Sequence, residues 1–495
     1  MALQTSHTGS DHPFLTGNYA PVNRELTEYD LPVTGTIPCH LDGRYVRIGP
    51  NPMGAVDPDQ YELFLGDGMV HGLRISDGRA HWYRNRWVRS ADVSRRLGEQ
   101  RDTSRRSGGV DFAANTYVLR HAGRTLALAE GGTTPYELTD ELDTVGPFDF
   151  CGTLRGGYTG HPKTDPVTGE MHAIAYSPVS GPSVRYSVTG LDGRIRRVVD
   201  IDVPNTMMHD FALTENNVVI FDLPVVLDLS VLHPSRPFRI AGPLVNRFAR
   251  THAMPAPLAG LLEFGSKRVR PHVAWPYRWD PKYQARFGAM PRGGGAHDLR
   301  WFPIDPCFIY HTLNAYEVGN TIVLEAPAHP TTYDGNSMPF NAPPTLERWI
   351  IDLEAGSVRT ERLDDRGQEF PRFDERIAGR KHRFGYTVGF ETNMVDNGYQ
   401  LQVLFKHDFV RQTTLTADFG PRTVPGEFVF VASAPDSGED DGVVMGFVYD
   451  GMTDRSDLVI LDAATLEQIA RVHLPTRIPS GFHGNWIPTE TKVDA

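Results

Sequence analysis

Short apolar runs separated by Asp-Gly pairs extend through most of this chain and constrain its fold more than any other feature. Examples of the runs are RTLALAE (124–130), NNVVIFDLPV (216–225), NTIVLEA (320–326) and GVVMGFVYD (442–450). Asp-Gly pairs stand at positions 42–43, 77–78, 192–193, 441–442 and 450–451. This dipeptide favours the tight turn of a β-hairpin. Many short strands joined by such turns predict an all-β protein, either a barrel, a sandwich or a propeller.

The length of 495 residues would suit about three average domains. No linker divides the chain, however, and a propeller closes the edges of many strands at once. We therefore expect a single propeller domain over residues 13–495, after a polar, disordered tail over residues 1–12.

Charge and cysteine content narrow the functional class. With 49 Lys and Arg against 61 Asp and Glu, the formal net charge is −12, which argues against a nucleic-acid partner. Cys39, Cys151 and Cys307 are isolated and indicate no disulfide framework. The N-terminus has neither the basic nor the apolar stretch of a secretory signal, and no apolar run is long enough for a spanning helix. These features favour a cytoplasmic protein.

Residues 223–268 depart from the strand pattern. Leu, Val, Phe and Met gather there with basic residues such as Arg236, Arg247 and Lys267, in a protein that is acidic overall. One interpretation is an insertion whose apolar side chains pack on the domain. The other is an amphipathic segment that rests on an anionic membrane surface, with the protein peripherally attached.

Three stretches share one internal arrangement, in which a histidine precedes a turn and then an apolar strand. They are HPKTDPVTGEMHAIAYSP, HDFALTENNVVIFDLP and HTLNAYEVGNTIVLEAP, and they begin at His161, His209 and His311. Equivalent positions on successive units of a radial fold can converge on one axis, so these histidines can meet although they lie far apart in the sequence.

His483, in GFHGNWIP, offers a fourth imidazole flanked by glycines, which let backbone approach closely. Either His483 is a packed residue in a tight turn, or a group is brought up against its ring. A single strand histidine is usually a satisfied core residue, and the residues alone leave a structural role and a metal site both open. Four neutral imidazoles would suit Zn, Cu, Fe or Ni rather than Mg or Ca.

Buried acids are the expected companions of such a site, because a metal-bound imidazole usually donates its other N–H to a carboxylate or carbonyl. Glu130, Glu369 and Glu427 each lie in or beside an apolar strand. The alternative for each is an ordinary place on the solvent face of its strand.

The order of several motifs identifies a family resemblance over nearly the whole chain. They run from GRYVRIGPNP (43–52) and ELFLGDGMVHGLRI (62–75), through the three histidine stretches, to QEFPRFDERIAGRKHRFGY (368–386), EDDGVVMGFVYD (439–450) and GFHGNW (481–486). In this order they resemble the carotenoid cleavage oxygenases, which include apocarotenoid oxygenases, lignostilbene dioxygenases and the isomerohydrolase of the retinal pigment epithelium.

The resemblance implies a seven-bladed β-propeller with a dome of loops and helices over an axial non-haem iron. It implies one Fe(II) per chain, held by His161, His209, His311 and His483, with Glu130, Glu369 and Glu427 each orienting an imidazole. Thr116, in AANTYV, would crowd one open position on the iron. His71, His297 and His382 are expected to be structural, solvent-exposed or hydrogen-bonded residues.

The implied reaction is cleavage of a C=C bond of a carotenoid or apocarotenoid by O2, which gives two carbonyl products. The partners would then be O2 and a lipophilic polyene, with membrane contact through 223–268. Stilbenoid-cleaving relatives carry a lysine just before the first of these glutamates, whereas this chain has Ala129. A stilbenoid or phenylpropanoid oxygenase is the alternative enzyme, and a non-catalytic metal- or lipid-binding propeller is the alternative from another class. The cleaved bond and the oligomeric state are not determined by the sequence.

Overall fold

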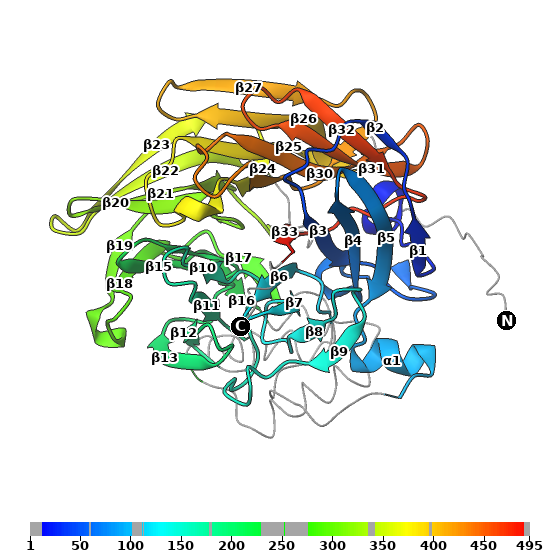
Figure 1. Cartoon of the computed structure of the whole chain (residues 1–495). Coiled ribbons are helices and arrows are strands. Elements are labelled where there is room, and N and C mark those ends of the chain that lie inside the picture. The colour runs from blue at the N-terminus through cyan, green and yellow to red at the C-terminus, as the bar shows by residue number, and fades with distance from the viewer. Residues whose placement is uncertain are drawn as a thin grey trace, which may run out of the picture.

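The structure is a computed structural model, and it describes residues 12–58, 61–100, 111, 113–177, 181–228, 252, 276–334, 342–395 and 398–489. Within these ranges the strands form seven sheets of four or more strands and one two-stranded sheet. The seven larger sheets are the blades of a β-propeller (Figure 1). The sequence-based prediction of an all-β, seven-bladed propeller is confirmed.

Four blades are simple meanders in which each strand pairs with the next along the chain. Blade 2 contains β6 (Tyr117–His121), β7 (Arg124–Leu128), β8 (Tyr136–Leu138) and β9 (Thr144–Pro147). Blade 3 contains β10 (Lys163–Thr164), β11 (Met171–Ala175), β12 (Ser183–Thr189) and β13 (Ile195–Asp202). Blade 5 contains β20 (Asn314–Val318), β21 (Thr321–Ala328), β22 (Thr345–Asp352) and β23 (Ser357–Asp364). Blade 6 contains β24 (Gln368–Arg372), β25 (Phe384–Val395), β26 (Gly398–Asp408) and β27 (Thr413–Asp418).

Blade 4 is interrupted between its second and third strands. Its strands are β14 (Phe211–Leu213), β15 (Asn217–Asp222), β18 (Arg286–Pro291) and β19 (Arg300–Pro303). The separate two-stranded sheet, β16 (Val225–Leu227) with β17 (Tyr277–Trp279), lies between them in the sequence.

The two ends of the chain close the ring by exchanging strands between blades 1 and 7. Blade 1 contains β1 (Leu26–Tyr29), β3 (Gly43–Pro50), β4 (Gly68–Ser76) and β5 (Arg79–Trp87), and the C-terminal strand β33 (Gly484–Pro488) pairs with β3. Blade 7 contains β28 (Thr423–Pro425), β29 (Val429–Ala432), β30 (Gly442–Asp450), β31 (Arg455–Asp462) and β32 (Gln468–His473), and the N-terminal strand β2 (Val33–Gly35) pairs with β32. The exchange places β33, and the residues just before it, against blade 1.

Helices are few and short in the described residues. They are the α-helix α1 (Ala91–Leu97) and the 3-10 turns η1 (Pro13–Leu15), η2 (Gly17–Tyr19), η4 (Leu63–Leu65), η6 (Ala296–Asp298) and η7 (Glu375–Ile377). Two of these turns, η2 and η4, supply residues to the wall of the cavity described below.

The Asp-Gly pairs serve two different purposes. Asp77 and Gly78 both have positive φ (52° and 69°) and link β4 to β5, with Ser76 opposite Arg79, as a two-residue hairpin turn requires. Gly43 and Gly442 instead begin strands. A Cβ at Gly43 would lie 2.5 Å from the Ile487 carbonyl oxygen. At these two positions the Asp-Gly pair does not form a two-residue hairpin turn, and glycine instead allows a neighbouring strand to approach.

Candidate metal centre

The four predicted histidines occupy matching places in four blades. His161 precedes β10, His209 precedes β14, His311 precedes β20 and His483 precedes β33, each by one to three residues. Each of these strands is an edge strand of its sheet. Blades 3, 4, 5 and 1 therefore each place one histidine just before the first residue of an edge strand.

The four imidazoles meet at one point. The ring centroids of His161 and His209 are 4.4 Å apart, those of His311 and His483 are 4.5 Å apart, and those of His161 and His483 are 4.8 Å apart. Potential ligand nitrogens of His161, His209 and His311 all lie within 4.8 Å of one another. Nε2 of His483 lies 3.0 Å from Nε2 of His311.

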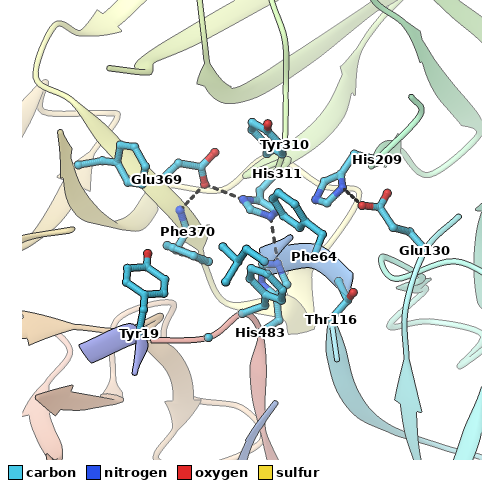
Figure 2. A pocket seen from close by; sticks show the side chains of 14 residues that line it. Tyr19, Phe64, Thr116, Glu130, His209, Tyr310, His311, Glu369, Phe370 and His483 are labelled. Atoms are coloured by element: carbon cyan, nitrogen blue, oxygen red, sulfur yellow. Dashed lines mark hydrogen bonds and ion pairs between the residues drawn. The ribbon is translucent and has the colours of Figure 1, made fainter. Parts of the chain in front are cut away.

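Each predicted glutamate contacts a different histidine at Nδ1, and Figure 2 shows this for Glu130 and Glu369. Glu130 accepts from His209 at 2.8 Å and Glu369 accepts from His311 at 2.6 Å. Glu427 accepts from His483 at 2.9 Å. Because a carboxylate only accepts hydrogen bonds, these contacts place the imidazole proton on Nδ1 and leave the lone pair on Nε2.

This tautomer makes the centre suited to a cation. The Nε2 atoms of His311 and His483 present two lone pairs at 3.0 Å, and Nε2 of His161 is buried with no hydrogen-bond partner. One extra proton would satisfy the first pair but would leave His161 unsatisfied. A metal ion with imidazole ligands would satisfy all of them, and such an ion belongs to the Fe, Cu, Zn or Ni group.

The three glutamates are themselves fixed by groups that sequence reasoning missed. Tyr176 donates its hydroxyl to Glu130 at 2.7 Å, and Nε2 of His329 lies 3.2 Å from Glu369. Each glutamate is thus held on both oxygens. No spacing rule links these partners to the glutamates, because each follows a strand of a neighbouring blade.

Glu427 has the most elaborate surroundings of the three. It accepts from the Gly484 N–H at 2.9 Å and lies 3.4 Å from Nη1 of Arg372. The same arginine donates to the Gly484 carbonyl and to Asn485 Oδ1. Arg372 therefore connects blade 6 both to strand β33, which directly follows His483, and to the carboxylate that contacts His483.

Burial and charge set the protonation of the centre. Burial, reinforced by His209 and the other two rings, holds the pKa of His161 well below its usual value. Burial raises the pKa of Glu427, but Arg372 and His483 outweigh it and bring this pKa to about 2. In His311, burial lowers the pKa and the Glu369 carboxylate outweighs burial, so the net shift is upward. Glu427 is consequently ionised, and His161 is neutral, which is the form that an imidazole needs in order to bind a metal ion.

A cavity of about 610 Å³ opens onto the imidazoles. Figure 2 shows Phe64, Tyr19, Phe370 and Tyr310 around the histidines, and Phe64 stacks on Phe482 with ring centroids 5.5 Å apart. The full set of lining residues is Tyr19, Leu63, Phe64, Thr116, Glu130, His209, Tyr310, His311, Glu369, Phe370, Phe390, Gly481, Phe482 and His483. The walls are largely aromatic, and the polar groups lie mostly at the histidine end.

Comparison with known proteins places the chain in a family. The sequence profile described as "Retinal pigment epithelial membrane protein" matches residues 19–488. A carotenoid cleavage oxygenase of Mycobacterium tuberculosis is 49% identical, over 97% of this chain and 98% of its own length. The chain belongs to the carotenoid cleavage oxygenase family. Its relatives carry the names of enzymes, and this chain is therefore an enzyme as well.

Solved structures of the family share the propeller. Lignostilbene dioxygenase of Pseudomonas brassicacearum superposes with a TM-score of 0.81 at 26% identity, covering 98% of this chain and all of that one. A cobalt-substituted apocarotenoid oxygenase of Synechocystis superposes with a TM-score of 0.76 at 25% identity, covering 97% and 99% of the two chains.

In this carotenoid cleavage oxygenase, Thr116 lies in the cavity wall with the histidines. Its hydroxyl donates to Asn115 Oδ1 at 3.1 Å, and its carbonyl accepts from the His483 N–H at 3.1 Å. A Cβ at Gly160 would come within 2.8 Å of Thr116 Cγ2. Gly160 therefore lets the chain before His161 pack directly on Thr116.

The glycines around His483 make room for blade 1 and not for a ligand. A Cβ at Gly484 would lie 2.5 Å from the Val46 carbonyl oxygen, and a Cβ at Gly481 would lie 3.0 Å from both Gly49 Cα and Arg47 Nη2. These glycines therefore allow the chain around His483 to pack closely against strand β3.

The other singled-out histidines lie outside the centre. His71 is buried against the Tyr83 hydroxyl at 2.9 Å, and burial lowers its pKa to about 3. His382 is buried 3.1 Å from Glu325, and the side chain of His297 is 85% exposed. Each has the structural or solvent-facing role expected of it.

Most of the 223–268 segment, from residue 229 onward except His252, lies outside the described residues, as do residues 1–11 of the expected tail. No helix in the described part of the chain is long and apolar enough to cross a membrane.

Proposed function

We propose that the chain is a non-haem Fe(II) dioxygenase that cleaves a C=C bond of a carotenoid or apocarotenoid with O2 to give two carbonyl products. One observation carries the proposal. Four imidazoles from four blades converge beneath an aromatic cavity, and carboxylates fix three of them with Nε2 free to bind a metal.

His161, His209, His311 and His483 would hold a single iron ion, and Glu130, Glu369 and Glu427 would keep three of their rings in the ligating tautomer. Ferrous iron, when bound, supplies the redox capacity to activate O2, which redox-inert zinc lacks. Thr116 would narrow access to one side of the ion from its place in the cavity wall.

The aromatic walls provide what a polyene needs. A conjugated chain has π faces and few polar groups, so it gains from aromatic surfaces such as Phe64, Phe482 and Phe370. Holding one double bond beside the metal decides which bond is cut, because proximity selects the reacting atoms. The apolar walls would also exclude water from the reacting bond.

A stilbenoid or phenylpropanoid substrate is the second candidate, and the resemblance to the Pseudomonas lignostilbene dioxygenase structure favours it. Against it stands Ala129, which is buried just before Glu130 and has no amine to meet a phenolic oxygen. We therefore place the polyene first.

The test is product analysis under ¹⁸O2. The Fe(II)-loaded protein is given a carotenoid, an apocarotenal and a stilbenoid separately, and rapidly reduced products are weighed by mass spectrometry. One labelled oxygen in each product from the apocarotenoid or carotenoid supports the proposal. Cleavage of the stilbenoid alone would transfer the assignment to the second candidate, and no cleavage of any substrate by an iron-loaded protein would contradict both.

We further propose that residues 13–495 form one domain and that its 223–268 segment rests on membranes, where a lipophilic substrate resides. The local basic and apolar composition supports this. Flotation with anionic liposomes tests it, because the intact protein should float and a folded 229–262 deletion should not. Equal partitioning of the two would contradict it.

A further inference from the structure

A second, smaller cavity of about 230 Å³ lies on the other side of the segment that carries His483. Ser480 lines it, whereas the next residues, Gly481 to His483, line the large cavity. Its remaining polar walls come from η2 and from blades 1 and 7, and include Asn18, Arg47 and Ser456.

Arg47 is the notable residue of this cavity. It is only 5% exposed. Among the described residues, its guanidinium makes one hydrogen bond, from Nε to the Phe482 carbonyl at 3.3 Å. No acid of the described residues lies within ion-pair distance of it, and neither terminal NH2 group has a hydrogen-bond partner among those residues. A buried charge is normally paired, and an arginine stays protonated in proteins.

Two glycines, Gly481 and Gly426, leave room for the Arg47 guanidinium. A Cβ at Gly481 would lie 3.0 Å from Nη2, and a Cβ at Gly426 would lie 3.5 Å from Nη1. The acid that influences Arg47 electrostatically, Glu427, is committed to His483, Gly484 and Arg372. Burial accordingly lowers the pKa of Arg47, because no close negative charge offsets the loss of water.

The cavity also offers hydroxyl donors. Ser480 Oγ accepts from Asn18 Nδ2 at 3.1 Å, and Ser456 Oγ accepts from the Ile478 N–H at 2.9 Å. Each hydroxyl proton is therefore left to donate elsewhere. Asn18 Oδ1 is buried with no hydrogen-bond partner among the described residues.

We propose that this cavity binds a small anion, a halide or a short carboxylate such as formate, between the terminal nitrogens of Arg47 and the hydroxyls of Ser480 and Ser456. The anion supplies the negative charge that would pair with the Arg47 guanidinium. Since Arg47 also holds the Phe482 carbonyl, the bound anion stabilises the chain segment that ends at His483.

Bromide diffraction tests the site directly. Crystals of the wild-type protein are soaked in sodium bromide, and anomalous differences are collected at the bromine edge. A peak in contact with Arg47 Nη1 or Nη2 is expected. Soaking with bromide plus excess formate separates the two sources, because loss of the peak identifies a carboxylate site and its persistence identifies a halide site. Ordered water alone at Arg47, with no anomalous peak, overturns the proposal.

Thermal unfolding adds a measurement in solution. Chloride should raise Tm saturably compared with the larger anion gluconate at equal ionic strength, because binding to the native state stabilises it. Arg47→Gln should lose this response, and Ser480→Ala should weaken it if the first variant does not fold. Arg185→Gln removes an exposed arginine paired with Asp200 and should keep it. An equal chloride response in Arg47→Gln and the wild type contradicts the proposal.

Discussion

Nε2 of His311 and Nε2 of His483 lie 3.0 Å apart, although 172 residues separate them in the sequence. Glutamates accept from the opposite nitrogens of both rings, so in the neutral rings neither Nε2 carries a proton to share. Two lone pairs at this distance repel unless a cation lies between them. This pair, with the unpartnered Nε2 of His161 beside it, is the structural reason for expecting a metal.

Replacing a ligand should abolish metal binding without unfolding the propeller. His209→Ala removes one of four imidazoles, and we expect the iron content to fall from about one ion per chain to a small fraction after gel filtration. His407→Ala removes another buried histidine, which bonds Gln368 and Thr387, and should keep the iron. Full iron in His209→Ala, with unchanged circular dichroism, would show that His209 is not a ligand.

Glu369→Gln should weaken metal binding by less than loss of a ligand. The amide keeps the shape of the carboxylate but not its charge, and such changes cost about 10–100-fold in metal affinity. The matched control is Glu325→Gln, which alters a buried carboxylate bonded to Arg348 in blade 5. Competition with a chelator measures both affinities, and an equal loss in the two variants would refute a special role for Glu369.

Tyr176→Phe tests the outer support of the centre. Without the hydroxyl, Glu130 loses one hydrogen bond and becomes less well ordered. Because the bond is to a charged group, we expect its loss to lower the free energy of unfolding by about 1.5–3 kcal/mol. We also expect weaker metal binding. Tyr186→Phe removes a comparable buried hydroxyl, 2.7 Å from His172. It should lower the urea midpoint but leave metal affinity unchanged. If both variants bind metal equally well, Tyr176 has only a structural role.

The sequence pointed to the centre because of local context repeated along the chain. His161, His209 and His311 each precede a strand, and a propeller turns that repetition into convergence. Tyr176, His329 and Arg372 escaped notice because each belongs to a different blade from the glutamate that it contacts, and their role depends on which blades become neighbours.

The strand exchange that closes the ring of blades could not be predicted from local sequence patterns either. β2 and β33 are short strands, and nothing in their own sequences predicts that Val33 pairs opposite Val472 or that Arg44 pairs opposite Ile487. Those partners are chosen by tertiary packing. The same holds for Gly43 and Gly442, which look like turn residues until the neighbouring strands are in place.

Stability of the metal-free protein should fall in mild acid through His172. Burial, with Arg292 nearby, lowers the pKa of this ring to about 4, against about 6.5 in an unfolded chain. Between these two pKa values the unfolded state binds more protons than the folded state. The free energy of unfolding therefore rises with pH across this window and decreases as the pH falls through it. The full effect is on the order of 3 kcal/mol.

Urea unfolding from pH 7.5 to pH 4.5 measures this effect. The midpoint of the wild type should fall more steeply below pH 6.5 than that of His172→Gln, whose side chain does not titrate. Parallel curves for the two proteins would show that His172 does not make this contribution.

Anomalous diffraction at the iron edge, on crystals of the Fe(II)-loaded protein, tests the central claim most directly. Our account predicts one strong peak per chain, within bonding distance of the Nε2 atoms of His161, His209, His311 and His483. A peak at any other place, or density at that point without an iron signal in a fully loaded crystal, would contradict it.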